Sequence, residues 1–125
     1  MSVALLIFLA ALLPFVAAVS AKFGGDGFTN HEPRGWLAKQ SGWRGRANGA
    51  QTNTFEALPL FYAALLYAHF SGVEPELIHW YGVAWLVFRL AYIVAYIKDK
   101  ASLRSLLWAI SFAINGLLLF SVKAI

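Results

Sequence analysis

The chain contains no cysteine among its 125 residues. It therefore has no disulfide framework, and no thiolate of its own that serves as nucleophile or metal ligand. Any thiol chemistry must come from a bound molecule. The histidines, His31, His69 and His79, are dispersed, and no cluster of His, Asp and Glu has the spacing of a metal site. We therefore predict no metal site.

Charged residues are also scarce. They make up 13% of the chain, whereas soluble domains carry about 25%. Hydrophobic residues make up 60%, and the mean hydropathy is +0.64. This balance excludes an ordinary soluble domain and predicts an integral membrane protein. The formal charge of +4 is modest, and we expect membrane lipids rather than nucleic acid as surroundings.

Four apolar segments stand out, each near the length that a helix needs to cross about 30 Å of hydrocarbon. They cover about residues 3–21, 51–71, 77–97 and 102–122. In lipid, backbone polar groups must be paired within the chain, which favours helices over open strands. The fold class predicted is all-α, an integral membrane four-helix bundle that forms a single domain over residues 1–125.

The first apolar segment has a second interpretation, a signal peptide, because residues 17–21 (AAVSA) end like a signal-peptidase site. Residues 1–6 carry no positive side chain, which a signal peptide has at its start, so we favour a retained helix. The polar stretch that follows contains Pro33, which suits the first turn of a short helix running through Trp36 to Lys39.

Basic residues are placed unevenly between the apolar segments. They lie in the first and third connections and at their borders: Lys22, Arg34, Lys39, Arg44, Arg46, Lys98, Lys100 and Arg104. The second connection has Glu74 and Glu76 and no basic residue. With four spans, both basic connections lie on one side of the membrane. The positive-inside rule places that side in the cytoplasm and both termini on the opposite side.

Two polar residues, Asn53 and Glu56, lie in the second apolar segment. A carboxylate inside a membrane-length helix costs about 2.5–3.5 kcal/mol on insertion scales, so we expect it to have a functional partner. Arg46 shares a broad face with these two residues if the helix extends back that far.

The third segment carries a polar stripe, whose members are spaced four, three and four residues apart: Trp85, Arg89, Tyr92 and Tyr96. Arg104 begins the fourth segment. We expect Arg89, Arg104 and the two tyrosines to line a cytoplasm-facing cleft with Asn53 and Glu56. Arginine binds carboxylates through two parallel hydrogen bonds. The set therefore suits a small zwitterionic ligand rich in carboxylates.

Simpler interpretations stay open for the same residues. Glu56 and Arg89 can form an internal ion pair that fixes the helix register, and Asn53 can make an interhelical hydrogen bond. The two tyrosines can be packing residues. Arg104 can be an interfacial anchor, and Arg46 can be one of the positive charges that set the topology.

Two motifs resemble a known family. Residues 50–61 (AQTNTFEALPLF), with an Arg-Ala pair shortly before them, resemble the second-helix signature of the membrane-associated proteins in eicosanoid and glutathione metabolism, the MAPEG family. The pattern Arg89-x-x-Tyr92-x-x-x-Tyr96, followed by Arg104, resembles its signature in the third and fourth helices. The likeness covers nearly the whole chain. The chain looks like a bacterial-type member of the family, and it resembles microsomal glutathione transferases and leukotriene C4 synthase.

The resemblance implies a homotrimer of four-helix subunits in a bacterial inner membrane. It implies that glutathione binds as cosubstrate between subunits on the cytoplasmic side, and that a lipophilic electrophile arrives from the membrane. Asn53 and Glu56 would hold the glutathione backbone, and Tyr92 and Tyr96 would line the site. Arg104 matches the arginine that stabilises the thiolate. Arg89 would contribute to the polar core or bind a carboxylate of the ligand.

The chain also departs from the family pattern. Glutathione-using members usually have an arginine seven residues before the glutamate, where this chain has Gly49. Arg46 lies about one turn earlier and is a candidate substitute. Ala57 stands where many members have tyrosine or asparagine. The resemblance thus favours a glutathione-dependent transferase or peroxidase, with a non-catalytic member that binds a lipid or small anion as the alternative. A proton-coupled exporter that uses Glu56 is a further alternative, which the neighbouring arginines oppose.

Overall fold

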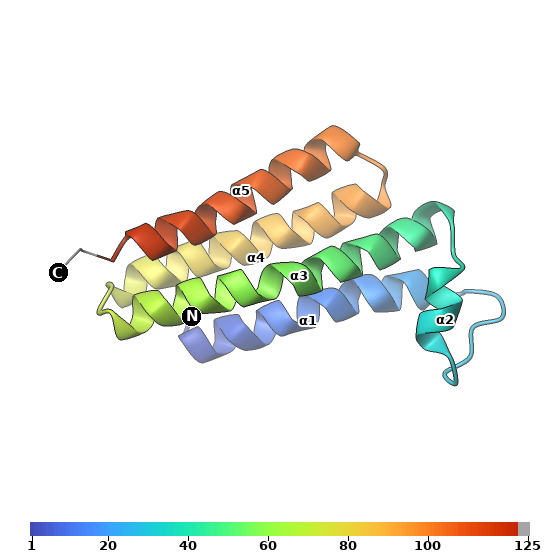
Figure 1. Cartoon of the computed structure of the whole chain (residues 1–125), viewed down its shortest axis with the longest axis horizontal. Coiled ribbons are helices and arrows are strands. Elements are labelled where there is room, and N and C mark those ends of the chain that lie inside the picture. The colour runs from blue at the N-terminus through green and yellow to red at the C-terminus, as the bar shows by residue number, and fades with distance from the viewer. Residues whose placement is uncertain (123–125) are drawn as a thin grey trace.

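The computed structural model describes residues 1–122, and this part of the chain is helical without a strand. Its helices are α1 (Val3–Lys22), α2 (Pro33–Ala38), α3 (Gly42–Phe70), α4 (Pro75–Ile97) and α5 (Ala101–Phe120). The four long helices run antiparallel to their neighbours in the chain, side by side, and α2 lies across one end (Figure 1). The predicted all-α bundle is confirmed, and so is the short helix that begins at Pro33.

The observed bounds of α1, α4 and α5 lie within two residues of the predicted segments. The start of α3 does not, because the helix begins at Gly42 rather than near residue 51. Hydropathy marks only the apolar part of a helix, whereas helical geometry continues through the basic residues before it. The helix also continues through Pro59 without a break.

Helices α3 and α4 form the middle of the bundle. Helix α1 packs mainly against α3, and α5 packs against α4 and α3 (Figure 1). Small side chains such as Ala10 and Ala64 are fully buried where α1 and α3 meet, which lets the two backbones approach closely. On α4, a Cβ added at Gly82 would lie 2.5 Å from Leu6 Cδ1, so a larger residue there would displace the Leu6 side chain of α1.

The outer surface of the long helices is apolar. Exposed side chains include Phe8 and Phe15 on α1, Val87 on α4, and Leu106 and Phe112 on α5. Meanwhile Thr54, Arg89, Ser111 and Asn115 are buried inside. A surface of this kind suits lipid rather than water. Helices α1, α4 and α5 are long and apolar enough to cross a membrane. The fourth predicted span, α3, falls outside this set because polar residues interrupt it, yet it lies between α1 and α4.

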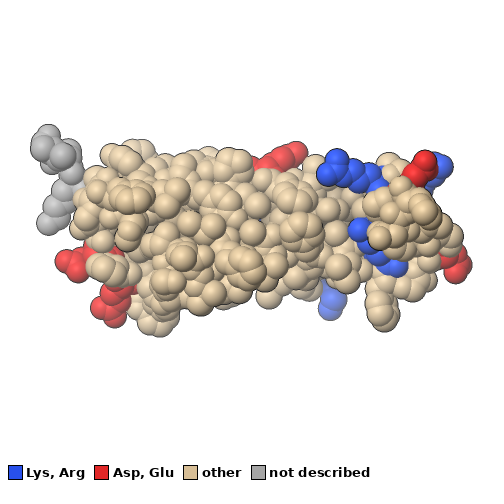
Figure 2. Space-filling view, turned by 90° about the horizontal axis from the view of Figure 1, so that it is seen from below, with Lys and Arg blue, Asp and Glu red and all other residues tan. Residues whose placement is uncertain are grey.

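Both basic connections lie at the same end of the bundle. The segment from α1 to α3 and the turn from α4 to α5 meet there, while α1 begins and α5 ends at the other end (Figure 1). Figure 2 shows most Lys and Arg side chains gathered towards that basic end, and a long middle region that is nearly free of charge. The fold therefore has the charge asymmetry of a membrane protein with one preferred orientation.

Candidate functional site

Three helices each present one stripe to a shared groove, and every stripe has the spacing four, three and four. The members are Gly49, Asn53, Glu56 and Leu60 on α3; Trp85, Arg89, Tyr92 and Tyr96 on α4; and Arg104, Trp108, Ser111 and Asn115 on α5. At 1.5 Å per residue, each stripe extends roughly 16 Å along its helix. We call this feature the polar groove.

The polar groove has two main parts. An outer cavity of about 460 Å³ lies toward the basic end, with Tyr92, Tyr96 and Arg104 in its wall. An inner cavity of about 220 Å³ lies further along the helices. Asn53 and Glu56 line both cavities, which are therefore neighbours. The six residues that the sequence assigns to a cleft all line this groove, whereas Arg46, which the sequence places on the same face as Asn53 and Glu56, does not.

Two arginines flank a pair of tyrosine rings along the outer part of the groove. The Arg104 guanidinium lies over the Tyr96 ring, 4.6 Å from its centroid. Tyr96 meets Tyr92 edge to face at 5.8 Å, and the Arg89 guanidinium lies 4.1 Å from the Tyr92 centroid. Each cation–π contact contributes up to about 2 kcal/mol when it is shielded from water. The series holds the Arg104 guanidinium in place at the outer cavity.

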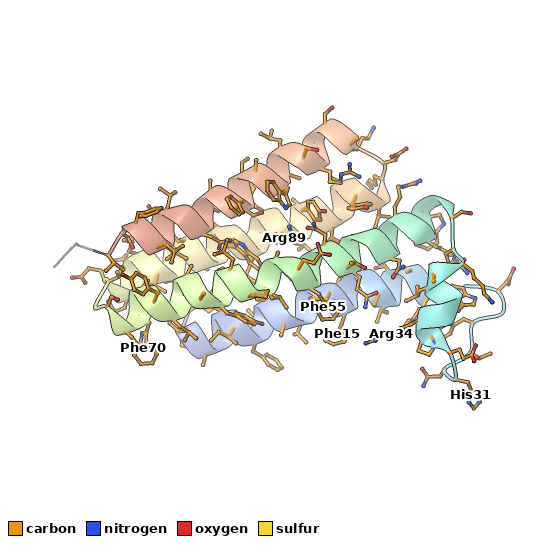
Figure 3. The ribbon with its side chains drawn as sticks, in the orientation of Figure 1. Phe15, His31, Arg34, Phe55, Phe70 and Arg89 are labelled. Atoms are coloured by element: carbon orange, nitrogen blue, oxygen red, sulfur yellow. The ribbon has the colours of Figure 1, made fainter. Side chains whose placement is uncertain are left out.

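Arg89 is only 1% exposed, and Figure 3 shows it inside the bundle. Its Nη2 donates to Asn53 Oδ1 and to Thr54 Oγ1, each at 3.0 Å. The Thr54 hydroxyl donates in turn to the Ala50 carbonyl at 2.7 Å. These bonds tie α4 to α3 and fix the Asn53 amide, with its oxygen on Arg89 and its NH₂ group left to donate elsewhere.

The ion pair between Arg89 and Glu56, one interpretation of the sequence, is not the arrangement found. The hydrogen bonds of the guanidinium go to the neutral groups of Asn53 and Thr54, while Glu56 is exposed. The reason is the helix face: Thr54 is buried toward α4, and Glu56, two residues on, points outward. The sequence interpretation missed Thr54. The sequence feature that could have identified Thr54 is its position next to Asn53, because a buried guanidinium needs several hydrogen-bond acceptors.

Gly49 and Arg46 show how this chain differs from the family pattern. A Cβ at Gly49 would lie 2.5 Å from the Tyr96 hydroxyl, so the tyrosine fills the space next to α3 where an arginine side chain would begin. The Nε of Arg46 donates to the Ile97 carbonyl at 3.0 Å, which satisfies a free carbonyl at the end of α4. Arg46 does not line the outer or inner cavity.

A second hollow lies on the other side of α3, against α1 and α2. Its volume is about 630 Å³, and its lining includes Lys22, Arg34 and Gln51. Phe15 and Phe55 meet there edge to face, with ring centroids 6.0 Å apart, and both are labelled with Arg34 in Figure 3. Like the outer cavity, it is lined by Thr52 and Glu56. Glu56 is thus reachable from both sides of α3.

The fold and the groove define an integral membrane helical bundle with an arginine-bearing polar groove near its basic end. Among residues 1–122, no three His, Asp or Glu side chains gather as a metal-binding group. The model of the MAPEG family matches residues 1–123, and the chain belongs to this family. It is thus a membrane protein of the glutathione and eicosanoid metabolism family. Comparison with curated proteins and with solved structures finds no match.

Proposed function

We propose that this protein is a glutathione-dependent transferase or peroxidase that activates the glutathione thiol beside Arg104. One observation carries the proposal: Arg104, Tyr96, Tyr92, Asn53 and Glu56 converge on a single cavity. These are the residues to which the family resemblance assigns glutathione binding. The chain has no cysteine, which fits a nucleophile supplied by the ligand.

The chemistry needs little more than position and charge. A free thiol has a pKa of about 8.5, and a nearby guanidinium lowers the thiol pKa because it stabilises the thiolate. Arg104, held over the Tyr96 ring, supplies that guanidinium. The Asn53 NH₂ group is free to bond a peptide carbonyl, and Glu56 can bind the ammonium group. Bringing the thiolate to an electrophile dissolved in lipid then accelerates attack through proximity.

The same residues set the strength of binding that we expect. Glutathione has two carboxylates, and the outer cavity offers Arg104 as its cation. Tyr96 replaces the family arginine next to Gly49 and contributes a neutral hydroxyl instead. A hydrogen bond to a neutral group contributes less than one to a charged group. We therefore propose weaker glutathione binding here than in members with the second arginine.

We also propose a homotrimer in a bacterial inner membrane, with the basic end in the cytoplasm. Thr52 and Glu56 are exposed in the single chain, and a carboxylate that faces lipid is unfavourable. A neighbouring subunit placed against the hollow beside Phe15 and Phe55 would cover Glu56 and complete the glutathione site. The orientation follows from the basic connections.

The test is a titration of glutathione into the detergent-purified protein, followed by the ultraviolet difference absorbance of the thiolate. We expect a saturable signal in the wild type that is lost in Arg104→Ala. Lys98→Ala is the matched control, because Lys98 is an exposed cation at the same end of the bundle and does not line the outer cavity. Wild-type signal in Arg104→Ala would contradict the role of that residue.

The absence of any signal, together with no thermal stabilisation by glutathione, would contradict glutathione binding altogether. That result would favour the non-catalytic alternative, in which the groove holds a lipid or another small anion. The exporter alternative requires proton-coupled uptake of a lipophilic cation into vesicles, and that uptake must be lost in Glu56→Gln.

A further inference from the structure

The wall of the outer cavity carries one positive and one negative side chain. Arg104 supplies the guanidinium and Glu56 supplies the carboxylate, and the other lining residues among residues 1–122 are neutral. The two charges of the wall therefore cancel. A ligand that brings additional negative charge meets no second cation in this wall, and a charged group that leaves water without an opposite charge weakens binding.

Three other arginines of α3 and α4 bond neutral oxygen atoms instead of lining this cavity. Arg89 bonds two side chains of α3, and Arg46 bonds a carbonyl at the end of α4. The Nη1 of Arg44 donates to the carbonyls of Ala21 and Phe23, at 2.7 and 2.9 Å, where α1 ends. These guanidinium groups hold the helices together. The cations left to bind ligand carboxylates are therefore fewer than the sequence suggests.

The wall of the outer cavity can pair two charged groups of a ligand. An ammonium group pairs with Glu56 and a thiolate pairs with Arg104, which uses both charges of the wall. Tyr96 fills the space beside Gly49 and brings a hydroxyl, which both donates and accepts hydrogen bonds. A primary amide also donates and accepts, whereas a carboxylate only accepts. The neutral part of the wall therefore fits an amide at least as well as a carboxylate.

We propose that the outer cavity recognises the amine and the thiol of its ligand and makes no use of the carboxylates. The ligand class is then the aminothiol peptides, whose acid groups can be removed or amidated without loss of affinity. Glutathione belongs to this class through its amine and its thiol. The inference rests on the proposed function and deepens it, because it names the groups of the thiol cosubstrate that the cavity binds.

The test compares glutathione with three analogues that each lack one charged group. Glutathione glycine amide lacks the terminal carboxylate, γ-aminobutyryl-cysteinylglycine lacks the glutamyl carboxylate, and glutaryl-cysteinylglycine lacks the amine. Each is titrated into the detergent-purified protein, and its affinity is taken from the midpoint of the thiolate absorbance signal. We expect the first two to bind at least as tightly as glutathione. The third should bind roughly tenfold more weakly, because it leaves Glu56 without its charged partner.

A cation added to the wall should change this preference. Thr52 is exposed and lines the outer cavity, so Thr52→Lys supplies a second cation, and Thr52→Gln is the uncharged control of similar reach. We expect Thr52→Lys to bind glutathione roughly threefold more tightly than at least one of the two analogues that lack a carboxylate. Thr52→Gln should keep the wild-type ratio of affinities. A ratio of two affinities does not change when part of the protein is misfolded.

The analogue series separates failure of this inference from failure of the proposed function. Weaker binding of either carboxylate-lacking analogue by the wild type would overturn the inference. A cation outside this wall, such as one on a neighbouring subunit, would then bind that carboxylate, while the thiolate signal would still support the proposed function. The inference is also overturned if the analogue without the amine binds as tightly as glutathione, or if Thr52→Lys leaves the ratio unchanged. No thiolate signal with any of the four thiols would contradict the proposed function itself, and the inference with it.

Discussion

Adding one methyl group at Gly49 tests how closely α3 and α4 approach at the outer cavity. In Gly49→Ala, the new Cβ would lie 2.5 Å from the Tyr96 hydroxyl oxygen and 2.8 Å from the ring carbon that carries it. Real Cβ atoms do not come this close to other heavy atoms, so the ring must move. Because Arg104 lies over that ring, its guanidinium must move as well.

Two opposing terms set the size of the effect on stability. Replacing glycine by alanine inside a helix stabilises it by up to about 1 kcal/mol. Forcing an extra methyl group into a packed contact costs about 1–3 kcal/mol. We therefore expect Gly49→Ala to lower the free energy of unfolding by about 1 kcal/mol. In a Tyr96→Ala background, where the obstacle is gone, the same change should raise the free energy of unfolding by up to about 1 kcal/mol.

The assay is unfolding in mixed micelles by a denaturing detergent, applied to the wild type, both single variants and the double variant. The coupling energy between the two positions should be about 1–3 kcal/mol. Gly116→Ala is the control, since its Cβ meets nothing within 4 Å, and it should be neutral or stabilising. If Gly49→Ala is as harmless as Gly116→Ala and the coupling energy is zero, the close approach of Gly49 and Tyr96 is refuted.

Three further predictions concern stability and topology. Thr54→Val should lower the free energy of unfolding by about 1–2 kcal/mol, because Arg89 loses a buried acceptor. In the same unfolding assay, the control Thr52→Val at an exposed position should change the free energy of unfolding by less than about 0.5 kcal/mol. Arg46→Ala should lower the free energy of unfolding by about 1 kcal/mol through loss of its bond to Ile97. A loss of more than about 1 kcal/mol in the free energy of glutathione binding would show instead that Arg46 contacts the ligand. Because the chain has no native cysteine, Lys98→Cys and Glu74→Cys can be labelled singly in intact cells and inverted vesicles. An impermeant maleimide should reach residue 98 only in inverted vesicles and residue 74 only in intact cells, and the reverse pattern would contradict the proposed orientation.

The long helices are predictable from sequence because length and hydropathy are local properties. Residues 77–97 and 102–122 lie within two residues of α4 and α5. The early start of α3 at Gly42 was not predictable in this way, since the residues before position 51 are polar and helical at the same time. Hydropathy indicates whether lipid or water surrounds a segment. A helix that extends from lipid into water becomes polar there while its backbone stays helical.

The candidate site is predictable only in part, for a related reason. The stripe of Arg89, Tyr92 and Tyr96 follows from the helical period within one segment. The partners of Arg89 do not, because the choice between Thr54 and Glu56 depends on how α3 is rotated about its own axis. The contact between Gly49 and Tyr96 depends on the distance between two helices, which a single sequence does not encode locally. The motif indicated the missing arginine, and the structure shows that a tyrosine fills its place.

Arg89 lines the inner cavity and holds Asn53, which lines both cavities. Its Nη2 orients the Asn53 amide, which lines both cavities, while its Nε is buried without a partner among residues 1–122. Both atoms belong to one planar guanidinium group, so a molecule that bonds Nε also restrains the plane that holds Asn53. Any coupling between the two cavities through this guanidinium would have the same factor in both directions. A single buried arginine thus ties the inner part of the polar groove to the outer part through Asn53.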